Sequence, residues 1–70
     1  MKKVIIVKGS EDGVIGVYTN KKLAFEAATE YANNPTLTYP KFCKEMRERT
    51  YAYQGDGYGY AICETFILNN

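Results

Sequence analysis

Two short apolar runs near the start of the chain are separated by a turn-forming sequence. Residues 4–7 are a continuous run of β-branched residues, which predicts a strand. Residues 14–18 form a second apolar run, and the Asp12-Gly13 pair between the two is typical of a β-hairpin turn. Gly16 interrupts the second run, which predicts a bulge or the close approach of another backbone. The pattern therefore predicts an N-terminal hairpin.

The residues that follow this hairpin change to a helical period. Thr19 or Asn20 can cap the helix, and Asn33-Asn34-Pro35 ends it, because Asn tolerates the left-handed conformation and Pro cannot continue a helix. Phe25 falls on the polar side, where we expect it to be either covered by the following loop or exposed. The apolar positions share one arc of the helix and are predicted to face the core: Leu23, Ala24, Ala27, Ala28 and Tyr31.

The stretch from Gly16 to Ala28, Gly-Val-Tyr-Thr-Asn-Lys-Lys-Leu-Ala-Phe-Glu-Ala-Ala, resembles a pattern found in many short uncharacterised bacterial and phage proteins. In those proteins a β-hairpin runs through a Tyr-Thr or Phe-Ser step into an Ala-rich helix. The resemblance covers roughly the first half of the chain. It implies the hairpin–helix architecture and an origin in a phage or mobile element, and it carries over no functional residue.

Residues 36–49 allow two interpretations. Pro40 is suited to the first turn of a helix, and Phe42, Cys43 and Met46 would then share one face. The alternative is a loop that runs into a strand. We favour the short helix.

A second hairpin is predicted by strands over residues 50–54 and 58–68, which flank Gly55-Asp56-Gly57. A two-residue loop of Asp56 and Gly57 sets four facing pairs: Gly55 with Tyr58, Tyr53 with Tyr60, Tyr51 with Ile62, and Arg49 with Glu64. Alternation then gathers the large apolar side chains on one face: Tyr51, Tyr53, Tyr58, Tyr60, Ile62, Phe66 and Leu68. A three-residue loop would instead divide the tyrosines between both faces. We favour the two-residue loop.

These elements predict a single α+β domain over residues 1–70. Its order is ββα(α)ββ, with a small antiparallel sheet and one main helix packed on one face. Because the first hairpin is apolar on both faces, we expect the remaining face of the sheet to meet the short second helix, another subunit or a partner. The competing hypothesis is a complete cover of the sheet by its own two helices.

Composition and charge restrict the chemistry. Nine basic and eight acidic residues give a net charge of +1, without the basic excess of a duplex-DNA binder. The sequence contains no His and no CxxC motif, and we expect no metal, no cofactor and no enzymatic activity. The apolar run of residues 4–7 is too short for a signal-peptide core or a membrane span. We therefore expect a cytoplasmic protein with two reduced, mostly buried thiols, Cys43 and Cys63.

The predicted tyrosine-rich face points to a small non-enzymatic protein-binding module. Tyr offers a large contact area at little cost in side-chain entropy. The residues expected to contact a partner are Phe25, Tyr51, Tyr53, Tyr58 and Tyr60. We expect the partner to be a host or cellular protein that a phage or mobile-element product modulates or inhibits, and we also expect a homodimer.

An alternative function is suggested by the segment Asp56-Gly57-Tyr58-Gly59-Tyr60-Ala61, which resembles the aromatic strand motif of RNA-recognition and cold-shock domains. The resemblance implies Tyr58 and Tyr60 as residues that stack on bases. Phosphate contacts would come from the preceding basic side chains: Lys41, Lys44, Arg47 and Arg49. The segment departs from the motif at Asp56, where a basic residue belongs, and at Cys63, where the last aromatic belongs. We therefore rank single-stranded nucleic-acid binding second.

Overall fold

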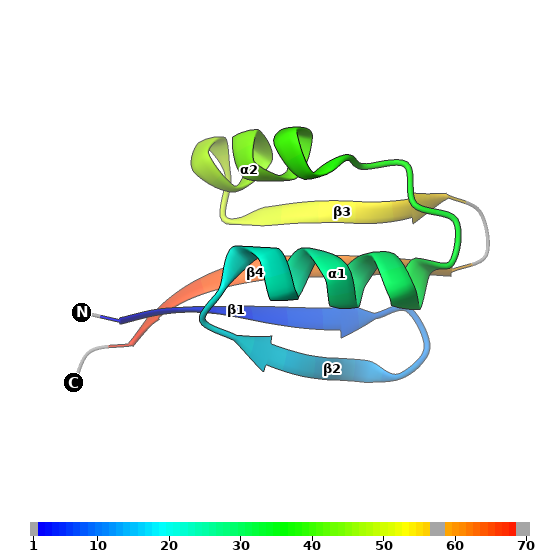
Figure 1. Ribbon diagram of the computed structural model, residues 1–70. Helices are drawn as coiled ribbons and strands as arrows, with labels where there is room; N and C mark the ends of the chain where they lie inside the picture. The colour runs from blue at the N-terminus through cyan, green and yellow to red at the C-terminus, as the bar shows by residue number, and fades with distance from the viewer. Residues whose placement is uncertain (1, 57–58, 69–70) are drawn as a thin grey trace.

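The computed structural model describes residues 2–56 and 59–68 and confirms the α+β class. Its elements follow the chain in the order β1 (Lys2–Gly9), β2 (Gly13–Tyr18), α1 (Lys21–Ala32), α2 (Tyr39–Glu48), β3 (Tyr51–Asp56) and β4 (Gly59–Leu68). The strands form one antiparallel sheet in the order β2-β1-β4-β3 (Figure 1). The first and last strands are thus central neighbours, paired from Lys2 opposite Leu68 to Gly9 opposite Ala61.

The predicted bulge is present in the first hairpin. Val7 lies opposite Gly16, whereas Lys8 lies opposite Val14, so Ile15 has no direct partner on β1. Because the bulge changes the alternation of β2, Val14 and Val17 point to the same face of the sheet.

Helix α1 begins and ends as its sequence predicts. The Asn20 side chain caps it by accepting hydrogen bonds from the backbone N–H groups of Lys22 (2.8 Å) and Leu23 (3.4 Å). Asn33 terminates it in the left-handed conformation, at φ 59°. The helix packs on the sheet through three small, buried residues, Ala24, Ala28 and Ala32.

One part of the predicted buried arc is wrong: Leu23 is 51% exposed. Its neighbour Phe25, on the opposite side of the helix, is half-buried and contacts Tyr39 and Phe42 of α2 at ring-centroid distances of 5.3 and 5.4 Å. The physical reason is the position of α2. Because α2 packs against the Phe25 side of α1, the buried arc rotates toward Phe25 and away from Leu23.

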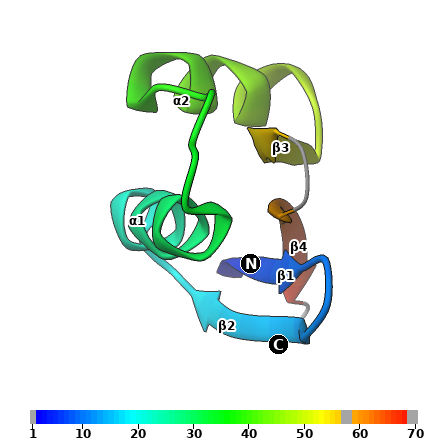
Figure 2. The ribbon, with the colours of Figure 1, turned by 90° about the vertical axis from the view of Figure 1, so that its right-hand side faces the viewer.

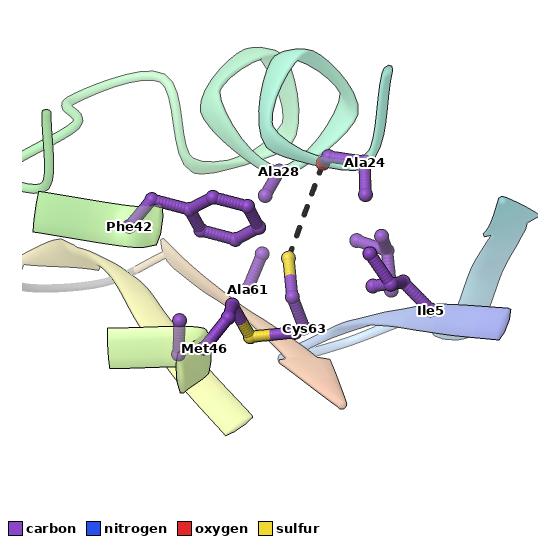
Figure 3. Packing of buried hydrophobic residues seen from close by; sticks show 9 residues of the cluster. Ile5, Ala24, Ala28, Phe42, Met46, Ala61 and Cys63 are labelled. Carbon is purple, nitrogen blue, oxygen red and sulfur yellow. Dashed lines mark hydrogen bonds between the residues drawn. The ribbon is translucent and has the colours of Figure 1, made fainter. Parts of the chain in front are cut away.

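The predicted second helix is confirmed. Pro40 lies in its first turn, Phe42 and Met46 are buried, and Cys43 is half-buried on the same side. Phe42 and Met46 join the residues of α1 and the sheet in one core, in which Cys63 points at α1 (Figure 3). The Cys63 thiol lies 3.9 Å from the Ala24 carbonyl oxygen and donates a weak hydrogen bond to it.

The predicted register of the second hairpin is wrong by two residues. Tyr53 lies opposite Ile62 rather than Tyr60, and the ladder continues to Asp56 opposite Gly59. The expected pair of Gly55 and Tyr58 involves a position outside the described residues. Gly55, which we expected just before the loop and opposite Tyr58, is instead a strand residue opposite Tyr60.

The backbone of Gly55 explains how the longer ladder is accommodated. Its φ of 116° is a conformation that other residues rarely adopt. A Cβ atom at this position would lie 2.6 Å from the carbonyl oxygen of Gly59, so only glycine fits between the two strands here. The expected pairing of Arg49 with Glu64 is also wrong, because Arg49 ends α2 and Tyr51 faces Glu64.

Gln54 is a buried polar residue that sequence reasoning did not single out. Its side-chain oxygen accepts a hydrogen bond from the Leu37 N–H (2.7 Å). Its side-chain nitrogen donates to the Leu37 carbonyl (3.0 Å) and to the Thr29 hydroxyl (2.9 Å). Gln54 thus attaches the loop between the two helices to strand β3.

Both helices contribute to the same side of the sheet. The buried residues of α1 and α2 contact inward-pointing residues of β1, β3 and β4, such as Val7, Ala52 and Cys63. Figure 2 shows α1 beside the sheet and α2 above β3, while neither lies against the other face. In the described part of the chain, the two helices therefore leave one face of the sheet uncovered.

Candidate functional site

The uncovered face of the sheet, called the open face below, is defined by the strand registers. Its members alternate with the core residues along each strand. They are Lys2, Val4, Ile6 and Lys8 of β1, Val14 and Val17 of β2, Tyr51 and Tyr53 of β3, and Tyr60, Ile62, Glu64, Phe66 and Leu68 of β4.

Three tyrosines form a row at the β3 end of the open face. Tyr51, Tyr53 and Tyr60 are 45%, 44% and 37% exposed, respectively. The rings of Tyr53 and Tyr60 stack with centroids 5.4 Å apart and an interplanar angle of 27°. Because the two residues are diagonal neighbours across β3 and β4, the register holds their rings together. The positions of the Tyr53 and Tyr60 rings are therefore set by the strand pairing itself.

Apolar side chains extend this surface across the other strands. Phe66 and Leu68 of β4 are exposed, and so are Val14 and Val17 of β2. Val4 and Ile6 lie between them on β1, where neighbouring strands largely cover them. All four strands thus contribute apolar side chains to the open face.

One ion pair lies at the middle of the open face. The Lys8 ammonium is 3.1 Å from a carboxylate oxygen of Glu64, and both side chains remain partly exposed. The pair forms because β1 is the neighbour of β4, a strand order that the sequence pattern did not reveal. A charged pair therefore lies within a surface that is otherwise mostly apolar.

The predicted site residues do not all gather at this face. The structure brings together Tyr51, Tyr53 and Tyr60, whereas Tyr58 lies outside the described residues. Phe25 is on the helix side of the molecule, where it packs between α1 and α2.

The predicted basic segment lies mostly on the helix side as well. Lys41 and Lys44 line a shallow surface cleft on α2 together with Glu45 and Glu48. Arg47 lines another cleft at the end of the same helix. Arg49 alone of the four approaches the tyrosine row, with its guanidinium 6.0 Å from the centroid of the Tyr51 ring. Lys41, Lys44 and Arg47 therefore lie apart from the stacked tyrosine rings, and Glu45 and Glu48 lie beside the two lysines.

A cleft of about 380 Å³ lies at the C-terminal end of α1, beside the turn of the first hairpin. It is lined by Ser10, Glu11, Asp12, Tyr31, Ala32, Asn33 and Gly59. The Glu11 N–H donates a hydrogen bond to the Tyr31 hydroxyl at 3.1 Å, which fixes the turn against the helix. Among residues 2–56 and 59–68, no group of three or more His, Cys, Asp or Glu side chains could hold a metal ion.

The two cysteines differ in their surroundings, and both are free thiols. Half-buried Cys43 lies beside Tyr39, and its hydrogen bond raises the pKa of the Tyr39 hydroxyl. Burial raises the pKa of the Cys63 thiol to about 11, because the thiolate would lose its hydration in the core.

Because burial raises the pKa of the Cys63 thiol, the fold should lose stability at alkaline pH. In the unfolded chain this thiol ionises near pH 8.5, so its contribution to stability is complete below that pH. As the pH rises from about 8.5 to 11, the unfolded state alone releases the proton, and we expect a loss of about 2–3 kcal/mol. Urea unfolding across this range should show the loss, and Cys63→Ala should lack this part of the slope. An identical slope in both proteins would contradict the assignment.

Neither helix in the described part of the chain has the length and apolar character needed to cross a membrane. A comparison of the chain with protein-family models, with curated proteins and with solved structures finds no match.

Proposed function

We propose that this chain is a small non-enzymatic module that binds another protein through the open face. The observation that supports the proposal is the exposed tyrosine row of Tyr51, Tyr53 and Tyr60 on a sheet face that neither described helix covers. We further propose that the partner is a host or cellular protein whose action the module modulates or inhibits. The resemblance of residues 16–28 to short bacterial and phage proteins implies a phage or mobile-element origin, in which such a role is plausible.

The physical argument rests on the free energy of apolar surface. A contiguous exposed patch larger than a few hundred Å² is uncommon on monomeric proteins and marks an interaction surface. Tyr is enriched at such surfaces, since its ring buries a large area while its hydroxyl remains able to hydrogen-bond. The stacked rings of Tyr53 and Tyr60 are already held in place, so binding would order few additional side chains.

The Lys8–Glu64 pair adds selectivity to this surface. Because it is partly exposed, it contributes little to folding, and its two charges can exchange partners when a complex forms. A partner that buries the open face without opposite charges at this point would leave both groups poorly solvated. We therefore propose that partner choice depends on the pair and that affinity depends on the aromatic row.

The test is affinity purification of the tagged chain from the cells in which it occurs, followed by calorimetry with each purified partner. We expect Tyr53→Ala to weaken binding by about 30-fold or more, because it removes a central aromatic contact. The matched control is Ile67→Ala, which removes an apolar side chain that is 54% exposed on the other face of β4. A partner that binds Tyr53→Ala as tightly as the unaltered chain would contradict the proposed surface.

Single-stranded nucleic acid is the second candidate, and a specific observation favours it. Exposed rings on an open four-stranded sheet are also the arrangement on which bases stack. It ranks second because Lys41 and Lys44 lie on α2, on the side of the sheet opposite the open face. Binding of mixed oligonucleotides that weakens steeply with salt and is lost in Tyr60→Ala would place nucleic acid first.

A further inference from the structure

The two edges of the sheet are protected differently. Beside β3, the Thr36 hydroxyl donates a hydrogen bond to the Gly55 carbonyl (3.5 Å), and Gln54 holds the Leu37 backbone. Helix α2 also packs against β3. Beside β2, by contrast, Figure 1 shows no further element of the described chain. The unpaired backbone N–H and C=O groups of β2 are therefore open to another strand.

The sequence of β2 has few of the features that normally protect an edge strand. Gly-Val-Ile-Gly-Val-Tyr contains no charged residue and no proline, which are the usual obstacles to pairing with another chain. The bulge at Ile15 is its one irregularity. Both Val14 and Val17 are 57% exposed, so apolar side chains accompany the free backbone groups.

Leu23 extends this apolar flank onto the helix layer. It lies about 200° around α1 from Phe25, which contacts α2, and so it is turned away from α2 and toward the β2 side. The helical period places it among the residues that should be buried, yet it is 51% exposed. Its exposure has a simple explanation if another molecule covers this flank.

We propose that the flank formed by β2 and Leu23 is covered by a second copy of this chain. The two β2 strands pair antiparallel about a two-fold axis and join the two four-stranded sheets into one continuous sheet. Such pairing brings identical strands together, and here it places no like charges opposite one another, because β2 carries none. The same rotation places both α1 helices on one side of the joined sheet, with Leu23 of each copy turned toward the seam between the two β2 strands.

The size of the molecule is compatible with this arrangement. A stable interface buries about 800 Å² on each partner. That is about one sixth of the 4805 Å² accessible surface of this chain, more than a lone six-residue strand provides. The exposed valines and Leu23 supply the additional apolar contact. Of the open face, only Val14 and Val17 lie at the β2 edge, and the tyrosine row on β3 and β4 stays free in each copy. This dimer therefore goes beyond the proposed partner binding and does not compete with it.

The test is the oligomeric state of the purified chain by sedimentation equilibrium. We expect a concentration-dependent dimer, and we expect Val17→Lys and Leu23→Lys each to raise its dissociation constant by about tenfold or more. The control is Ile67→Lys, which adds the same charge at an equally exposed apolar position on β4, and it should leave the constant unchanged. Hydrogen exchange should show that the outward-pointing N–H groups of residues 13–18, which do not bond to β1, are protected only at concentrations where the dimer forms.

A chain that stays monomeric at every concentration would overturn the dimer. A dimer that Tyr53→Ala weakens while Val17→Lys and Leu23→Lys leave it intact would also overturn it, because the contact would then lie at the tyrosine row and not at the β2 edge. Since all the substituted side chains are exposed, circular dichroism should show each variant folded. The experiment uses only the purified chain, so its failure is separate from failure of the proposed partner binding.

Discussion

Phe42→Ala should lower the free energy of unfolding by about 3–5 kcal/mol, the usual cost of deleting a buried aromatic ring. Phe42 of α2 is 1% exposed and points into the core between α1 and the sheet (Figure 3). Its ring also packs against those of Phe25 and Tyr39. A chain of 70 residues has about 4–10 kcal/mol of stability in total, so this one change removes a large part of it. Urea unfolding followed by circular dichroism measures the loss.

The matched control is Phe66→Ala, because Phe66 is 41% exposed on the open face. The same truncation there should cost only about 1–2 kcal/mol, since Phe66 is already partly exposed and its loss leaves no enclosed cavity. If Phe42→Ala fails to fold at all, Phe42→Leu still tests the packing, with an expected cost of about 1–2 kcal/mol. Equal effects at positions 42 and 66 would contradict the assignment of Phe42 to the core.

Gln54→Leu should be destabilising by about 3–5 kcal/mol, although it replaces a polar residue in the core with an apolar one. The substitution leaves the Leu37 N–H and carbonyl and the Thr29 hydroxyl without their partner. Each buried polar group that loses its hydrogen bond costs about 1–3 kcal/mol. We also expect faster amide exchange in the loop at residues 33–38, because Gln54 attaches this loop to β3.

Thr29→Val separates the contributions of this network. It removes only one of the three hydrogen bonds, so its expected cost is about 1 kcal/mol. In the double variant with Gln54→Leu, the two costs should not add, because both changes break the same bond. A Gln54→Leu protein as stable as the unaltered chain would show that the loop does not depend on this side chain.

The elements of this fold follow from local signals. The two hairpins are indicated by Asp12-Gly13 and by Gly55-Asp56-Gly57, and the ends of α1 are indicated by Asn20 and Asn33. Each of these signals acts within a few residues, through backbone conformation or a capping hydrogen bond. That range is why they could be recognised without knowledge of the tertiary structure.

The register error in the second hairpin left the composition of the open face intact. A shift of two residues keeps every side chain on its side of the sheet, whereas a shift of one would have exchanged the faces. Tyr51, Tyr53 and Tyr60 were therefore correctly predicted to share a face, even though Tyr53 and Tyr60 are diagonal rather than direct neighbours.

Features that depend on contacts between distant elements could not be predicted. Leu23 and Phe25 exchange their expected environments because α2 lies on one side of α1, and a helical wheel does not contain that information. Glu64 pairs with Lys8 rather than Arg49, because β1 inserts beside β4. The burial of Gln54 also depends on distant contacts. The three groups that it hydrogen-bonds belong to Thr29 of α1 and to Leu37 of the following loop.

The central place of β1 and β4 has a consequence for how the chain reaches its native state. Residues 2–9 and 61–68 come from opposite ends of the described chain, and their ladder of eight residue pairs joins the two hairpins. Neither hairpin can bury its apolar side alone. Folding therefore requires an encounter between segments that are far apart in sequence, and the entropy cost of closing such a long loop makes this step slow. Conversely, a protease cut between the helices would leave two fragments that this ladder still holds together.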